Sequence, residues 1–114
     1  GTGQFYSINL TTGVTTPIFE IAHNGTTLKD LRAFVYHPKE DKYFISEATN
    51  SGGDLFSVDI STKSATLIND NIGDEPWDAV VNWAVDSDDS LLSIGDFNAD
   101  GNGFVKFGTN GGRS

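Results

Sequence analysis

An internal repeat with a period of about fifty residues constrains the fold of this 114-residue chain more than any single motif does. Residues 5–18 (FYSINLTTGVTTPI) align without a gap with residues 55–68 (LFSVDISTKSATLI) at an offset of 50, with four identical positions. At an offset of 49, residues 33–65 align with residues 82–114, and a weaker third copy of the first segment begins at Phe104. Periods of about 20 to 50 residues are typical of stacked repeats. We therefore expect similar units packed one after another.

Within one repeat, short apolar segments alternate with turn-forming residues, which is the spacing of antiparallel strands rather than of βαβ units. In one segment Phe56, Val58 and Ile60 share a face, as the two-residue period of a strand requires. No helix is needed. The best-defined repeat predicts four strands, over Leu31–Tyr36, Lys42–Glu47, Leu55–Ile60 and Ala65–Ile68. The sequence thus predicts an all-β fold of antiparallel four-stranded meanders.

We expect one repeat module over residues 1–114, divided into three parts. The first part supplies only the two outer strands of a unit, and the last part begins with an inner strand pair. The expected parts are outer strands and a connecting loop over 1–30, a complete unit and its connecting loop over 31–79, and an incomplete unit over 80–114. The expected terminal strands are Phe5–Leu10 and Thr15–Phe19 in the first part and Val80–Val85 and Leu91–Ile94 in the last.

The composition excludes several classes of partner. The formal net charge of −9 repels nucleic-acid phosphates and anionic lipid surfaces, so we do not expect nucleic-acid binding. The chain also lacks the long apolar run that a membrane span needs, so we do not expect membrane insertion. The chain has no cysteine, which leaves no disulfide or thiolate site and leaves the redox compartment open. With 37% hydrophobic residues it can bury one modest core.

The repeated segments carry a family resemblance. FYSINLTTGVTTPI and LFSVDISTKSATLI resemble the recurring LY-x-I-[ND]-x-x-TG-x-x-T-x-I strand pair of secreted bacterial β-propellers, and residues 31–46 (LRAFVYHPKEDKYFIS) are similar to the inner strand pair of the same blades. The resemblance implies a β-propeller-type stack of about 2.3 blades in a secreted or cell-surface bacterial protein. Such blades occur in structural, binding and enzymatic propellers alike.

The number of blades raises a question of assembly. Propellers close with about four to eight blades, so 2.3 repeats cannot close a ring alone. Three arrangements stay open: a fragment of a longer propeller, a homo-oligomer that completes a ring, or a small two-sheet sandwich. In the second, a neighbouring chain donates its outer strands to residues 80–94, which gives a four- or six-bladed ring from a dimer or trimer.

Strand directions place residues 69–79 and 96–103 at the same end of the stack, where they form the best candidate functional surface. Trp77 has no aromatic counterpart in the earlier repeat, which suggests contact with a ligand, either a sugar face or a protein. We take the ligand-binding residues to be Trp77, Asp74, Glu75 and Asp78, within a group of acids that also includes Asp70, Asp96 and Asp100.

Residues 96–101 (DFNADG) space oxygen ligands as a calcium loop does, with Gly101 permitting a tight turn. The segment resembles the calcium loops of EF-hand-like and integrin-type blade repeats over these six residues. The expected ligands are Asp96, Asn98, Asp100 and Asn102, with ligation completed by the Asn102 carbonyl, by water or by an acid from residues 74–78. The alternative is an ordinary hairpin turn, because Asn, Asp and Gly tolerate positive φ and the matching segment 47–52 keeps the glycine but lacks the acids.

No catalytic signature emerges. We expect His23 and His37 in loops at opposite ends of the stack, and no G-x-S-x-G segment is present. Phe34 and Trp83 occupy matched positions and are expected to pack between units. The sequence therefore favours a non-catalytic binding or scaffolding module, stabilised by calcium if the Asp96 loop binds the ion. The alternatives are an oligomeric lectin-like propeller and a fragment of a propeller enzyme.

Overall fold

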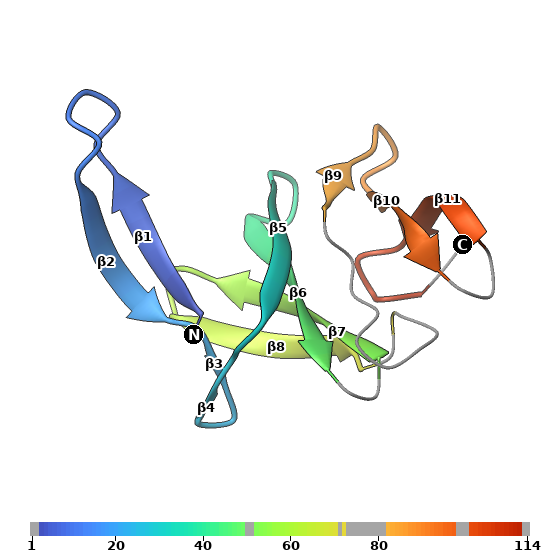
Figure 1. The fold of residues 1–114 in the computed structure, drawn as a ribbon, viewed down its shortest axis with the longest axis horizontal. Coiled ribbons are helices and arrows are strands. Elements are labelled where there is room, and N and C mark those ends of the chain that lie inside the picture. Colours follow the sequence, from blue (N-terminus) through green and yellow to red (C-terminus); the bar gives the residue numbers. More distant parts are fainter. Residues whose placement is uncertain (1–2, 50–51, 71, 73–81, 98–100, 113–114) are drawn as a thin grey trace.

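The computed structural model describes residues 3–49, 52–70, 72, 82–97 and 101–112. These residues form eleven β-strands and no helix, arranged in four antiparallel sheets (Figure 1). Accordingly, this part of the chain holds no helix long and apolar enough to cross a membrane. The all-β, antiparallel fold predicted from the sequence is confirmed.

A four-stranded meander, here called the central sheet, forms the middle of the molecule. Its strands pair in chain order and are β5 (Leu31–His37), β6 (Lys42–Thr49), β7 (Gly52–Asp59) and β8 (Ser64–Asn69). Asp41 adopts φ of 52° in the β5–β6 turn, and Lys63 adopts φ of 56° in the β7–β8 turn. Asp tolerates this left-handed conformation better than Lys does. The four strands predicted between residues 31 and 68 are confirmed, with ends shifted by at most three residues.

The N-terminal part forms two hairpins. The first pairs β1 (Gln4–Ile8) with β2 (Thr15–Glu20), as predicted, and has a bulge between Phe5 and Tyr6. The second pairs β3 (Ala22–His23) with β4 (Thr26–Thr27) in the segment expected to be a connecting loop. Asn24 and Gly25, at φ of 51° and 78°, make the tight two-residue turn of this hairpin.

The C-terminal part forms a three-stranded sheet, here called the C-terminal sheet. Its order is β11 (Gly101–Phe107), β10 (Leu91–Phe97), β9 (Ala84–Val85). Strand β11 begins three residues before the weak third repeat copy at Phe104. Because β11 pairs with β10 along its whole length, it occupies the edge at which a neighbouring chain's outer strands were expected. A donated hairpin could extend this sheet only beyond β9 or β11.

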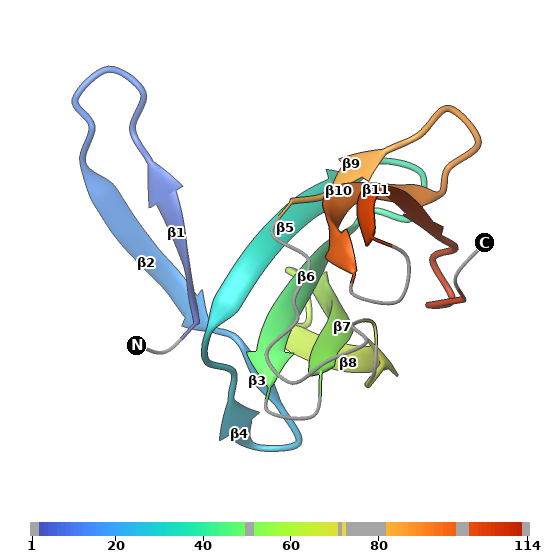
Figure 2. The same ribbon diagram turned by 45° about the vertical axis from the view of Figure 1, so that its right-hand side comes forward.

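Three layers stack to form the core. Alternation along β6 sends Tyr43 and Ile45 to one face of the central sheet and Phe44 to the other. The N-terminal hairpins cover the first face and the C-terminal sheet covers the second, so the two lie on opposite sides of the central sheet (Figures 1 and 2). The first cluster contains Ile21, Leu28, Ile45, Phe56, Val58 and Ala65. The second contains Phe44, Leu55, Ile72, Trp83, Leu91, Val105 and Phe107.

The matched residues Trp83 and Phe34 have different surroundings. Trp83 is 8% exposed and meets Phe107 in a T-shaped contact between the central and C-terminal sheets, as expected. Phe34 is 64% exposed, and the expected burial between units is not found. The physical reason is that the β1–β2 sheet has only two strands. It does not extend far enough over β5 to cover Phe34.

Candidate binding cleft

Most of the site predicted from the sequence lies outside the described residues. This applies to Asp74, Glu75, Trp77 and Asp78 of the ligand site and to Asn98 and Asp100 of the calcium loop. The other two proposed calcium ligands are described by their backbone. Asp96 lies directly opposite Asn102 on the β10–β11 ladder, one pair before its last pair, Phe97 and Gly101. Among the side chains described, no three acids or histidines are grouped as metal ligands.

Residues 69–79 and 96–103 were expected to form an acidic surface at one end of the stack. The described acids at that end of the central sheet are Glu47, Asp54 and Asp70. Glu47 and Asp54 are direct partners across β6 and β7, and the backbone N–H of Lys29 donates to Glu47 Oε2 at 2.6 Å. Partial burial raises the pKa of Asp54, and the charges of Glu47 and Asp70 raise it further. Ionisation of Asp54 at this end of the central sheet therefore opposes folding.

The two histidines form structural contacts at opposite edges of the central sheet. His37 ends β5 and is fully buried; Glu40 N–H donates to its Nδ1 at 3.2 Å, so Nε2 donates to the Asp89 carbonyl at 2.8 Å. His23, in β3, donates from Nδ1 to the Ala65 carbonyl at 3.1 Å. Neither histidine lies in the loops expected, and the two do not face each other as a catalytic pair would.

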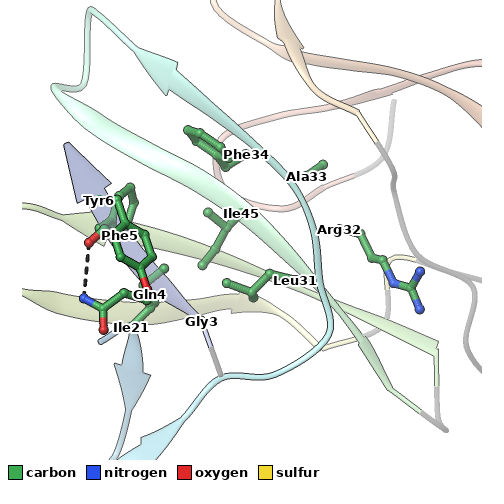
Figure 3. Close-up of a pocket in the computed structure, with 10 residues that line it drawn as sticks. All are labelled: Gly3, Gln4, Phe5, Tyr6, Ile21, Leu31, Arg32, Ala33, Phe34 and Ile45. Carbon is green, nitrogen blue, oxygen red and sulfur yellow. Dashed lines mark hydrogen bonds between the residues drawn. The ribbon is translucent and has the colours of Figure 1, made fainter. Parts of the chain in front are cut away.

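An apolar cleft of about 530 Å³ opens between β1 and β5 (Figure 3). Its deepest residues are Ile45 and Ile21, at 1% and 3% exposure. The side chain of Arg32 points away from the centre of the cleft, so the lining is mainly apolar (Figure 3). The lining residues are Gly3, Gln4, Phe5, Tyr6, Ile21, Leu31, Arg32, Ala33, Phe34 and Ile45.

Local contacts hold the walls of the cleft in place. Gly3 donates to the Leu28 carbonyl at 2.8 Å and accepts from Ile21 at 2.9 Å, and a Cβ at this glycine would lie 2.5 Å from Leu31 Cδ1. The ring of Phe5 lies 5.2 Å from that of Tyr43 and 6.2 Å from that of Phe34, both in T-shaped contacts. The cleft is therefore a preformed feature of packed elements and does not require a loop to close.

One side of the cleft is an open strand edge. Asn9 N–H donates to the Val14 carbonyl at 2.9 Å, which makes these residues a hydrogen-bonded pair of the β1–β2 hairpin. Because such pairs alternate along an antiparallel ladder, the amide groups of Tyr6 and Ile8 point away from β2. Pro17, which has no N–H, lies opposite Tyr6 and agrees with this pattern. Within the described part of the chain, no strand pairs with this edge of β1.

Sequence reasoning missed the cleft, although a signal was present. Strand β5 carries large apolar residues on both faces, which indicates a strand covered on both sides. Among the described residues, β1 and β2 form a sheet of only two strands, which leaves part of one face of β5 uncovered. Comparison of the chain with family models, with curated proteins and with solved structures found no match.

Proposed function

We propose that this chain is a non-catalytic binding or scaffolding module of β-propeller type, from a secreted or cell-surface bacterial protein. The observation that carries the proposal is the apolar cleft beside the open edge of β1. Contiguous apolar surface next to unpaired backbone groups suits contact with another polypeptide. The residues that line the cleft offer few groups for acid–base or nucleophilic chemistry.

The described polar side chains support a non-catalytic role, because many of them act in turns. Asp59 accepts from Ser61 N–H and hydroxyl at 2.9 and 2.6 Å, and its pKa is lowered by these bonds. The backbone N–H of Ser87 lowers the pKa of Asp86, and Lys106, which pairs with Asp86 and Asp88 at 3.1 and 2.7 Å, lowers the pKa of both acids. These contacts stabilise charged forms on the surface rather than preparing a reactive group.

Direct binding assays test the proposal. The purified chain is examined by light scattering over a wide concentration range, with calcium and with chelator, and is screened against hydrolase substrates. A binding or scaffolding module is expected to show no turnover and to associate through its apolar surfaces, either with itself or with an added polypeptide. Measurable turnover that survives repurification would contradict the proposal and favour the propeller-enzyme alternative.

A lectin-like function is the second candidate, since the unmatched Trp77 lies among Asp74, Glu75 and Asp78 in the sequence. The test is a glycan array probed with the wild-type chain and with Trp77→Ala. Glycan retention by the wild type that is lost in Trp77→Ala, with unchanged thermal stability, would favour the lectin. Trp83→Phe serves as a control for loss of an indole elsewhere.

A further inference from the structure

We propose that the cleft between β1 and β5 is a strand-acceptor site, which binds an extended segment of a partner polypeptide antiparallel to β1. The inference rests on the proposed binding function and names its partner class. The partner contributes main-chain hydrogen bonds to the open edge of β1 and places an apolar side chain over β5. This is the physics of β-strand addition, in which the ladder gives affinity and the pockets give specificity.

The repeat identifies the missing strand. At the offset of 50, β1 and β2 correspond to β7 and β8. In the central sheet, the edge of β7 that does not contact β8 is occupied by β6, which pairs antiparallel with it. The position beside β1 is therefore equivalent to that of β6, and among the described residues no strand fills it.

The same correspondence defines the chemistry of the partner. Tyr6, Ser7 and Ile8 correspond to Phe56, Ser57 and Val58, whose partners across the ladder are Ile45, Phe44 and Tyr43. A segment beside β1 is therefore expected to carry three successive large apolar residues. Phe5 corresponds to Leu55, which shares a core cluster with Phe44, so the middle residue of the three faces the cleft.

The environment of Phe34 supports this orientation. Phe34 corresponds to Trp83 at the offset of 49, and Trp83 packs in the same core cluster as Phe44. Trp83 is 8% exposed, whereas Phe34 is 64% exposed. The Trp83 position thus shares a core cluster with an aromatic residue of the preceding unit, whereas the Phe34 position is open. A partner aromatic in the cleft would occupy the position that corresponds to Phe44 and reduce the exposure of Phe34.

The cleft also continues an existing interface. Phe5 already packs against Tyr43 and Phe34, so a strand added beside β1 extends the contact that joins the N-terminal hairpin to the central sheet. A second copy is the less suitable occupant, because its strands of this type are paired already: β6 with β5 and β7, and β10 with β9 and β11. We therefore commit to a strand from a different polypeptide.

The probe is a fluorescent peptide with the sequence of β6, KYFISEAT, titrated into the full chain and followed by anisotropy. Binding is expected to be saturable and to protect the amides of Tyr6 and Ile8 from hydrogen exchange. A peptide with proline at the positions of Tyr43 and Ile45 lacks the donors that the ladder needs and should not bind. A peptide with alanine in place of Phe44 should bind about tenfold more weakly, because it leaves the cleft unfilled.

Variants of the chain separate the ladder from the cleft. Tyr6→Pro removes the outward N–H without touching the β1–β2 ladder, and Tyr6→Thr is its matched control with the N–H retained. Phe34→Ala should weaken binding about tenfold. Leu10→Ala, at the 96% exposed tip of the hairpin, should leave it unchanged. Unfolding midpoints are measured for every variant so that loss of binding is not confused with loss of fold.

Three results would overturn the acceptor site. They are absence of saturable binding, equal affinity of Tyr6→Pro and Tyr6→Thr, and amide protection at β11 instead of β1. Self-association of the chain with the same sensitivity to Tyr6→Pro would show that a second copy, and not a foreign strand, is the occupant. Failure of the peptide to bind leaves the broader proposal to the turnover and glycan assays, which do not depend on this cleft.

Discussion

Alanine substitution at the matched positions Trp83 and Phe34 tests the stacking of the three layers. The repeat places both residues at one structural position, yet Trp83 is 8% exposed and Phe34 is 64% exposed. If the central and C-terminal sheets bury Trp83 between them as described, and the N-terminal hairpins leave the Phe34 position uncovered, the two substitutions should have very different effects on the free energy of unfolding.

The magnitudes follow from burial. Trp83 buries roughly 200 Å² of aromatic surface, which at about 25 cal/mol per Å² is worth about 5 kcal/mol. Its Nε1–H is buried with no acceptor among the described residues, and removing that unpaired donor returns about 1 to 3 kcal/mol. Trp83→Ala should therefore cost about 3 kcal/mol. Phe34 buries about a third of its surface, so Phe34→Ala should cost about 1 kcal/mol.

Urea unfolding followed by circular dichroism measures both values. A difference of about 2 kcal/mol corresponds to midpoints about 1 M apart, with equal slopes. Each titration is repeated at several protein concentrations to detect association. Equal losses of stability in the two variants, independent of concentration, would refute the layered arrangement, because they would require Phe34 to be as well covered as Trp83.

Three further experiments test local features. Asp54→Asn should stabilise the chain at neutral pH. Because the pKa of Asp54 is raised in the folded state, the stability of the wild type falls as pH rises through that pKa. Urea titrations should therefore show that the higher stability of the variant disappears in acid. Gly13→Ala should lower the unfolding free energy by about 1 kcal/mol, because Gly13 has φ of 77° and open space around it, so only backbone strain is added; Gly112→Ala is the comparison without positive φ. Calcium should raise the thermal midpoint of the wild type and not of Asp96→Asn/Asp100→Asn; equal midpoints with calcium and with chelator would favour an ordinary turn.

The central sheet could be predicted because its determinants are local. Two-residue alternation and turn residues such as Asp41 mark each strand without reference to the rest of the chain. The β3–β4 hairpin was missed although its Asn24–Gly25 turn is a strong hairpin signal, since its strands of two residues have no alternation to detect. Strand β11 extends through residues 101–103 because pairing with β10 overrides the weak strand propensity of Gly-Asn-Gly.

The candidate site was harder to predict because it depends on contacts between distant residues. The burial of His37 requires the carbonyl of Asp89, which is 52 positions away. The cleft likewise depends on how β1 lies against β5, and on a strand position that is empty within the described residues. The alternation of residues along a strand predicts which of its faces are apolar. It does not predict which of those faces another element covers in the folded chain.

The open edge of β1 also bears on colloidal behaviour. No charged residue occurs between Gln4 and Phe19, so the edge lacks the lysine or glutamate with which natural sheets discourage templated fibril growth. Its protection consists of a bulge at Phe5 and Tyr6 and of the net charge of −9 on the whole chain. At high salt, where that repulsion is screened, aggregation should therefore nucleate at residues 4–8 before any other segment.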